Sequence, residues 1–221
     1  MTERYLHIGC GPNVLPKPFE NLDIRELEGV DHISDVYPLT FEDNTFDLIY
    51  CSHVLEHIER DRTQLILNEW VRVLKPGGTL RISVPSFESL SKIYQKNGKL
   101  VSVIGPLMGG QTYVQNFHYN AFDTKSLTEY LNKAGLTAIH PWDYRRTSHA
   151  DYWDFSQATT EEIPTSLNLE GRKKYITKDK IEASISIIEK EIKFLKQEKV
   201  STTLLESIFL LKINSWEYID E

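Results

Sequence analysis

The sequence has few cysteines, no long apolar run and no excess of basic residues, and each shortage excludes a class of protein. Its 221 residues include only Cys10 and Cys51, which is too few for a disulfide framework and favours a reducing setting. No stretch approaches the roughly 20 apolar residues of a membrane span, and the N-terminus lacks the basic and then apolar segments of a signal peptide. We therefore expect a cytoplasmic protein without a membrane span.

The charge balance argues against a nucleic-acid partner. The formal net charge is −7, with 25 Lys and Arg residues against 32 Asp and Glu. No run of Lys and Arg is dense enough to follow a phosphate backbone. With 40% hydrophobic residues, a chain of this length can bury one substantial core.

Short apolar runs alternate with helix-like stretches up to about position 140, which predicts an α/β fold with a largely parallel sheet. The expected strands cover residues 5–8, 21–24, 46–51, 79–84 and 137–142, and the clearest helices cover residues 61–74 and 124–134. On the first helix, one apolar face is predicted to consist of Leu65, Ile66, Trp70, Val73 and Leu74.

Two further segments differ from this framework. Residues 86–123 contain glycine and proline pairs and several aromatic residues, which suggests an inserted lid in a domain of residues 1–176. Residues 177–221 are expected to form a helical extension. There, one apolar seam with spacings of four, three, four and three could pack on its own domain or pair two subunits into a homodimer: Ile181, Ile185, Ile188, Ile192 and Leu195.

A glycine turn follows the first expected strand. Gly9 and Gly11 flank Cys10, and glycines at such a position let the backbone approach a nucleoside that any Cβ would displace. A G-x-G sequence can also be only a tight turn. Asp23, at the end of the second strand, could accept hydrogen bonds from both ribose hydroxyls or could cap a turn.

Asp35 and Val36 extend this set. The carboxylate of Asp35 could accept a hydrogen bond from an exocyclic amine while Val36 lies against an adenine face. The alternative for Asp35 is a loop-capping role.

Four motifs then occur in sequence, at residues 6–11, 22–24, 46–58 and 73–80. In this order they resemble the motifs of class I S-adenosylmethionine-dependent methyltransferases of the small, type 11-like group. The resemblance covers about the first 85 residues and, more loosely, residues 122–136. It implies a Rossmann-like doubly wound sheet, mostly parallel with an antiparallel edge strand, with S-adenosylmethionine as cofactor and S-adenosylhomocysteine as product.

The resemblance also implies residue roles. The glycines would flank the methionine and ribose, Asp23 would hold the ribose, and Cys51 and Ser52 would lie beside the sulfonium. The complete set of expected cofactor-binding residues is His7, Gly9, Cys10, Gly11, Asp23, Asp35, Val36, Cys51 and Ser52.

The chain departs from the family pattern around the glycine turn. The first expected strand begins almost at Met1, so we expect no cofactor-covering helices before it. The connection to Asp23 is short and contains Pro12, Pro16 and Pro18, which disfavour a crossover helix. We expect an open pocket that the lid or the C-terminal helices close.

The H-x-x-E-H sequence from His53 to His57 is also a spacing by which a helix presents two zinc ligands and a general base. Because it directly follows a buried strand and no further ligand cluster lies at an obvious spacing, we expect no metal. Glu56 and His57 are expected to shape the mouth of the pocket instead.

Two histidines are candidates for the general base that a hydroxyl acceptor needs. His53 is the first by location, and His118, among lid aromatics, is the second; either could be a hydrogen-bonded packing residue. Substrate contacts are expected from His57, Tyr113, Tyr119, Arg145 and Arg146. The two arginines could clamp a phosphate or carboxylate, or could lie in a solvated loop.

The acceptor class comes from a looser resemblance. Residues 145–170, ending in an expected strand at 166–170, are similar to the tails of small methyltransferases linked to surface-polysaccharide synthesis. This favours O-methylation of a sugar, nucleotide-sugar or phosphorylated glycan precursor. The alternatives are a nicotinamide-dependent oxidoreductase, although Val14 replaces the third glycine of G-x-G-x-x-G, and a non-catalytic binding module that uses the C-terminal seam.

Overall fold

The computed structural model describes residues 3–175, 186–187, 189–190 and 193. The chain divides into two units, Met1–Lys174 and Tyr175–Glu221. The apolar seam predicted in the second unit lies outside the described residues, and so does the homodimer contact expected from it. The first unit therefore carries the fold and the site. Within the described part of the chain, no helix is both long and apolar enough to cross a lipid bilayer.

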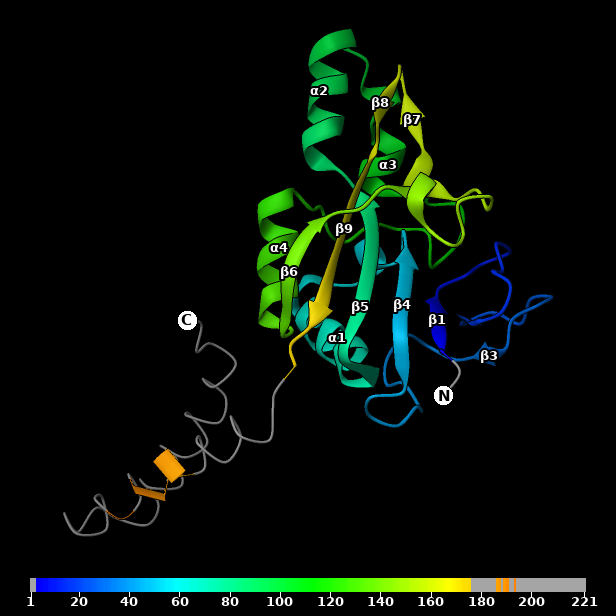
Figure 1. Cartoon of the computed structure of the whole chain (residues 1–221). Coiled ribbons are helices and arrows are strands. Elements are labelled where there is room, and N and C mark those ends of the chain that lie inside the picture. The colour runs from blue at the N-terminus through cyan, green and yellow to red at the C-terminus, as the bar shows by residue number, and fades with distance from the viewer. Residues whose placement is uncertain (1–2, 176–185, 188, 191–192, 194–221) are drawn as a thin grey trace. The chain divides into compact units, whose positions relative to one another are not determined.

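One seven-stranded sheet forms the centre of the first unit, in the order β3-β2-β1-β4-β5-β9-β6 (Figure 1). A two-stranded hairpin, β7 with β8, stands apart from it. The strands are β1 (Tyr5–Ile8), β2 (Phe19–Asp23), β3 (His32–Ile33), β4 (Phe46–Ser52), β5 (Leu74–Pro85), β6 (Leu136–Pro141), β7 (Thr159–Thr160), β8 (Ile163–Pro164) and β9 (Ser166–Lys173).

Four α-helices and four short 3-10 helices connect these strands. The helices are η1 (Leu55–His57), α1 (Arg60–Val73), α2 (Phe87–Asn97), η2 (Leu100–Ser102), α3 (Ile104–Met108), α4 (Thr124–Lys133), η3 (Tyr144–Arg146) and η4 (Phe155–Gln157). All these elements lie in the described residues of the first unit, and they confirm the predicted α/β fold.

The sheet is mostly parallel, as predicted. β1, β2, β3, β4 and β5 pair in parallel. The expected antiparallel strand is present as β9, but it is not at the edge: it pairs with β5 on one side and with β6 on the other. Strand β9 thus lies between two strands that precede it in the sequence. The local sequence pattern does not specify such a long-range pairing.

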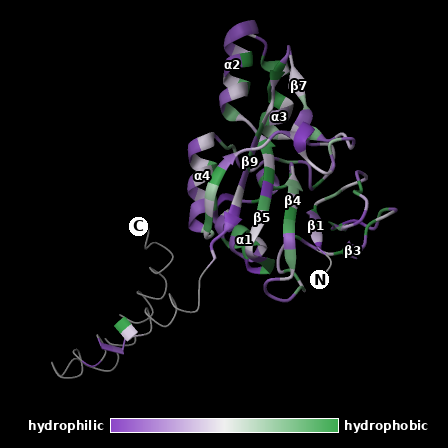
Figure 2. Ribbon diagram, in the orientation of Figure 1, coloured by the Kyte–Doolittle hydropathy of each residue, from purple (hydrophilic) through white to green (hydrophobic). Residues whose placement is uncertain are grey.

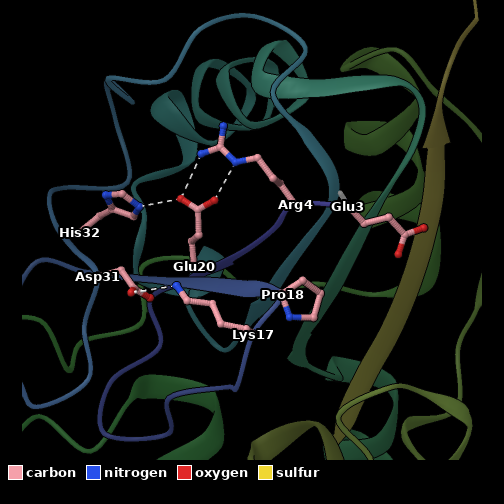
Figure 3. Close-up of a pocket in the computed structure, with 7 residues that line it drawn as sticks. All are labelled: Glu3, Arg4, Lys17, Pro18, Glu20, Asp31 and His32. Atoms are coloured by element: carbon pink, nitrogen blue, oxygen red, sulfur yellow. Dashed lines mark hydrogen bonds and ion pairs between the residues drawn. The ribbon is translucent and has the colours of Figure 1, made fainter. Parts of the chain in front are cut away.

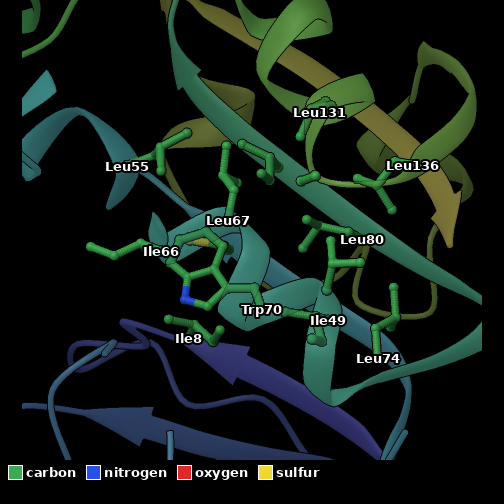
Figure 4. Close-up of a cluster of buried hydrophobic side chains, with 14 of the residues drawn as sticks. Ile8, Ile49, Leu55, Ile66, Leu67, Trp70, Leu74, Leu80, Leu131 and Leu136 are labelled. Atoms are coloured by element: carbon green, nitrogen blue, oxygen red, sulfur yellow. The ribbon is translucent and has the colours of Figure 1, made fainter. Parts of the chain in front are cut away.

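Alternating side chains give the central strands two different faces. On β4, Ile49 and Cys51 point to one face and pack in the main core, whereas Tyr50 points to the opposite face. The main core lies between the first face and helices α1 and α4, and Figure 4 shows Ile8, Leu67, Trp70 and Leu131 meeting there. Hydrophobic residues accordingly concentrate along the central strands (Figure 2).

Helix α1 covers this face with a stripe that differs in part from the predicted one. Ile66, Trp70 and Val73 are buried as expected, but Leu65 is 46% exposed and Leu67 is fully buried in its place. The helix is rotated so that Leu67, Trp70 and Val71 face the sheet and Leu65 faces away from it.

The opposite face of the sheet has a separate aromatic cluster. Tyr50 and Phe19 pack there with Trp142 and with Leu15 from the proline-rich connection that replaces a crossover helix. His149 is buried among these rings, 4.3 Å from Tyr50 between ring centroids. Loop segments therefore cover this face where the described chain has no helix between β1 and β2.

Residues 86–123, predicted as a lid, begin with regular structure. Helix α2 extends beyond the carboxyl end of β5 (Figure 1). Leu90 and Ile93 of α2 form a small core with Val103, and Leu107 of α3 and Ile163 of β8 pack against it. Only the stretch after α3 is irregular up to Ala121.

Replacement of Leu67 by alanine should destabilise the first unit by about 2–5 kcal/mol, because it leaves a cavity in the main core. The matched replacement Leu65→Ala, on the same helix, should change the free energy of unfolding by less than about 0.5 kcal/mol, because Leu65 is exposed. Urea unfolding of both variants measures the two values. Equal losses would contradict the orientation of α1.

Stability should fall as the pH is lowered from about 6.5 to about 4. Burial lowers the pKa of His7 and of His149 to about 4 each, so between these limits the unfolded chain binds protons that the folded chain does not. The stability contributed by the neutral rings is complete above pH 6.5 and is lost towards pH 4. Thermal unfolding across this range should show a flatter pH dependence in His149→Phe. The variant His140→Phe, which alters an exposed histidine on β6, should keep the wild-type slope, and an unchanged slope in His149→Phe would count against the explanation.

Candidate functional site

The glycine turn after β1 is held against the end of β2 by backbone hydrogen bonds. The amides of Gly9 and Cys10 both donate to the carbonyl oxygen of Leu22, at 2.8 and 3.0 Å. Gly9 has φ +66°, and a Cβ there would lie 2.3 Å from a methyl carbon of Val54. The turn therefore requires glycine both for its backbone conformation and for the approach of the chain that follows β4.

Asp23 joins the end of β2 to this turn. Its Oδ2 accepts hydrogen bonds from the Gly11 amide at 2.8 Å and from Arg25 Nη2 at 3.3 Å. Its Oδ1 accepts from the amide and Nε of Arg25, at 3.0 and 2.9 Å. Burial by itself would raise the pKa of Asp23, but these hydrogen bonds outweigh it and the pKa is lowered. The carboxylate is thus ionised at neutral pH, and all four of its acceptor positions are in use.

A cavity of about 350 Å³ opens beside this carboxylate, at the carboxyl ends of β1, β2 and β4. Ligands of open α/β sheets bind at such strand ends. Eight residues singled out from the sequence line it: Gly9, Asp23, Asp35, Val36, His53, His57, Tyr113 and Tyr119. The structure therefore brings together residues from five separate stretches of the sequence, including the stretch after α3.

Among the lining residues that were not predicted, three bear on ligand binding. Ile24 is 48% exposed although apolar, and it lies on the cavity wall together with Val36. Arg25 and Arg62 also line the cavity. Arg25 could have been found from its position two residues after Asp23, because a basic side chain there can reach back to the carboxylate. Arg62 depends on how α1 packs, which the sequence does not show.

The other residues predicted to bind cofactor or substrate are not among those that line this cavity. Gly11 acts behind it, through its bond to Asp23. Ser52 ends β4 without reaching the cavity lining. Burial raises the pKa of the Cys51 thiol well above its usual value and that of Cys10 to about 12. Both thiols are consequently protonated, and neither can act as a nucleophile at neutral pH.

His7, Arg145 and Arg146 lie elsewhere. The ring of His7 is stacked on Tyr50 in the aromatic cluster of the opposite face, because strand alternation points it away from the core side. Arg145 pairs with Asp143 at 2.8 Å, with its side chain 73% exposed. This agrees with the solvated-loop alternative for the two arginines and not with a clamp in the cavity.

His118 reaches the site indirectly. It lies beside His57, with the rings edge to face and their centroids 4.6 Å apart. Its Nε2 is 4.0 Å from Oε1 of Glu56, and Nδ1 of His53 is 3.0 Å from the same oxygen. Burial raises the pKa of Glu56, but the surrounding imidazoles, His53 first, outweigh this and lower it. Three histidines thus surround one buried carboxylate next to the cavity.

A second cavity, of about 430 Å³, lies at the amino ends of the strands and is lined by charged side chains (Figure 3). Arg4 and His32 both bond to Glu20, and Lys17 pairs with Asp31 at 3.1 Å. These charged side chains are paired with one another, so they leave few groups with which a ligand could form hydrogen bonds or ion pairs. The cavity beside Asp23 remains the candidate site.

Replacement of Gly9 by alanine should destabilise the protein more than replacement of Gly98. Gly98 ends helix α2 with almost the same backbone angle, φ +65°, but a Cβ there would have no neighbour within 4 Å among the described atoms. Both variants carry the cost of a positive φ, about 1–2 kcal/mol, and only Gly9→Ala adds the clash with Val54. Urea unfolding measures the difference, and equal losses would show that Val54 yields without cost.

Comparison with known proteins identifies the fold. Residues 12–82 match a family model described as a methyltransferase domain. A stretch of 59 residues is 42% identical to an uncharacterized protein of Methanocaldococcus jannaschii, covering 27% of this chain and about a quarter, 25%, of that protein's length.

Solved structures extend the likeness to most of the first unit. A SAM-dependent methyltransferase of Methanosarcina mazei has a TM-score of 0.52 at 16% identity, over 80% of this chain and 95% of that one. A possible histamine N-methyltransferase of Thermotoga maritima has a TM-score of 0.51 at 19% identity, over 79% and 83% of the two chains. At such identities the likeness shows the fold alone, and the family model covers residues 12–82 of the 221.

Proposed function

We propose that this protein transfers a methyl group from S-adenosylmethionine to an oxygen atom of a small polar acceptor. The observation that carries the proposal is the cavity beside Asp23, in which a glycine turn, an ionised carboxylate and an apolar wall meet at the carboxyl ends of β1 and β2. This combination suits the ribose and adenine of the cofactor. The likeness of the fold to that of methyltransferases favours S-adenosylmethionine among nucleoside ligands.

The residues of the cavity fit the adenosyl group in chemical type. Asp23 would accept hydrogen bonds from the ribose hydroxyls, while Ile24 and Val36 would lie against the adenine and Asp35 would accept from its amine. An exposed isoleucine on a cavity wall is explained if a flat apolar ligand covers it. Val54 can approach Gly9 this closely only because position 9 has no side chain, and both residues line the cavity.

Arg25 sets a condition for this binding. It occupies three of the four hydrogen-bonding positions on the Asp23 carboxylate. Two of these come from the guanidinium, whose side chain is 42% exposed and which can therefore move at modest cost. Ribose binding would replace the guanidinium, and the amides of Gly11 and Arg25 would keep the carboxylate oriented.

The cofactor, when bound, supplies a methyl group on a positively charged sulfur, from which an acceptor oxygen can displace it. The chain's own contribution is to position the acceptor and to take up its proton. Of the two histidines predicted as bases, only His53 lines the cavity, and Glu56 lies behind its ring at 3.0 Å. His53 is therefore the residue we propose for this role, with its Nε2 leaving Ser166 to take up the proton and with His118 placed to act through Glu56.

The acceptor class follows from the outer wall. Tyr113 and Tyr119 are each about half exposed, and Arg62 and Gln115 lie on the same cavity. Aromatic rings beside hydrogen-bonding groups suit a sugar ring, and a basic residue suits a phosphate on it. A sugar, nucleotide-sugar or phosphorylated glycan precursor is the acceptor that we propose, with residues 113–119 closing over it.

Replacement of Asp23 by asparagine should weaken the binding of S-adenosylhomocysteine about tenfold to a hundredfold, because a hydrogen bond to a charged acceptor contributes about 1.5–3 kcal/mol. Isothermal titration calorimetry measures the two affinities. The matched control is Asp47→Asn, which alters a carboxylate paired with Lys75 outside the cavity and should bind as the wild type does. Thermal unfolding of both variants shows whether they are folded.

The same titrations with NAD separate the proposal from a nicotinamide-dependent oxidoreductase. Binding of NAD without binding of S-adenosylhomocysteine would overturn the proposed function. Cofactor binding without transfer of a methyl group to any component of sugar and nucleotide pools, assayed as a mass gain of about 14 Da, would favour a non-catalytic module with this fold.

A further inference from the structure

A cluster of Glu56, His57 and His118 lies next to the cavity and remains unexplained by cofactor binding. Donor atoms of the three side chains all lie within 4.8 Å of one another. Glu56 and His57 belong to η1, directly after β4, whereas His118 comes from the stretch that follows α3. The two segments are joined by backbone hydrogen bonds, because the amides of Tyr119 and Asn120 donate to the carbonyl oxygen of Glu56 at 2.8 and 3.2 Å.

Glu56 is the unusual member of the cluster. Its side chain is fully buried, and neither carboxylate oxygen has a hydrogen-bond partner of good geometry among the described residues. A buried carboxylate without such partners costs several kcal/mol unless a positive charge compensates it. The lowered pKa of Glu56 reflects the histidines around it. The contacts of these histidines show whether they can supply the positive charge that compensates the carboxylate.

His57 and His118 each donate a hydrogen bond from Nδ1 to a backbone carbonyl oxygen. Nδ1 of His118 lies 2.9 Å from the oxygen of Pro106, and Nδ1 of His57 lies 3.1 Å from the oxygen of Phe117. A carbonyl oxygen can only accept, so Nδ1 is the donor in both rings and Nε2 of each neutral ring carries a lone pair. This backbone bond on the far nitrogen is the arrangement that fixes metal-binding histidines.

The contacts of His53, which also lies against Glu56, assign the roles of its two ring nitrogens in the same way. Ser166 donates its hydroxyl proton to the oxygen of Phe155 at 2.7 Å, so its Oγ accepts from Nε2 of His53 at 2.8 Å. A neutral His53 then points the lone pair of Nδ1 at Oε1 of Glu56, 3.0 Å away. Two electron-rich atoms at this distance repel each other unless a cation lies against them or His53 itself is protonated.

We propose that Glu56, His57 and His118 bind a divalent transition metal ion, with Zn²⁺ the best match to two imidazoles and one carboxylate. Three protein ligands leave a coordination position open. Because His57 also lines the cavity, the ion would lie against the cavity wall. If the proposed function is correct, the open position binds an acceptor oxygen and lowers the pKa of its hydroxyl.

This site differs from the zinc motif weighed in the sequence. An H-x-x-E-H motif presents two histidines from one α-helix, but His53 has φ +54° and precedes a 3-10 helix. The expectation of no metal rested on the missing further ligand. His118 supplies that ligand from far along the chain, which the spacing of residues cannot reveal.

The test is metal content. Protein stripped with a chelator and dialysed against equimolar Zn²⁺, Mn²⁺ and Co²⁺ should retain about one equivalent of metal, measured by plasma mass spectrometry. Co²⁺ in the site should also give visible absorption bands of imidazole and carboxylate ligation. Glu56→Gln and His118→Ala should each weaken retention at least tenfold, whereas His140→Ala, which removes an exposed histidine of β6, should retain metal as the wild type does.

Glu56→Gln keeps the shape of the side chain and removes the buried charge. Thermal unfolding without metal should therefore show this variant to be at least as stable as the wild type. Loss of metal from it cannot then be ascribed to unfolding. Absence of bound metal in the wild type, or retention unchanged in Glu56→Gln, would overturn the proposal. S-adenosylhomocysteine titrated into the stripped protein tests the proposed function separately, because Asp23 and Gly9 need no metal.

Discussion

The attachment of the turn after β1 to the end of β2 is the constraint on which the site depends. Two amides of the turn share the carbonyl oxygen of Leu22, and a third, from Gly11, reaches the carboxylate of Asp23. These bonds fix the turn where the proline-rich connection provides no helix to do so. They also direct the carboxylate along the cavity floor, so the same interaction that closes the turn prepares the proposed ribose contact.

The walls of the cavity depend on packing that is distant in sequence. The indole nitrogen of Trp70, in the main core, donates to the carbonyl oxygen of Val36 at 3.1 Å. On the outer side, residues after α3 are attached to η1 through the carbonyl oxygen of Glu56. The two sides of the cavity are thus bonded to α1 and to η1, which follows β4. Segments without regular structure can define a binding site here because each is bonded to a rigid element.

Much of the fold follows from local pattern. Alternation in β1 and β4 and the periodicity of α1 place residues on the correct elements, and the site residues at strand ends gather because parallel strands end at one edge. Other features need the folded chain. The insertion of β9 between β5 and β6 is a long-range pairing, the burial of Leu67 and not Leu65 depends on how α1 rotates against the sheet, and the approach of His118 to Glu56 joins segments with no common pattern.

The site predictions divide in the same way. Asp23, Asp35 and Val36 were predicted from motifs that mark the ends of strands, and all three line the cavity. His7 was predicted because it is adjacent in sequence to the turn, but its ring is stacked on Tyr50 on the opposite side of the strand. Arg145 and Arg146 were placed by residue type alone, and their position outside the cavity shows how little two adjacent charges specify.

The central claim is that the carboxylate of Asp23, freed from the guanidinium of Arg25, holds the ribose of the methyl donor. A crystal structure of the protein with S-adenosylhomocysteine tests it most directly. The account predicts both ribose hydroxyls within hydrogen-bonding distance of Asp23, the adenine between Ile24 and Val36, and Arg25 turned away. A nucleoside bound elsewhere, or bound here with the Arg25 pair intact, would contradict it.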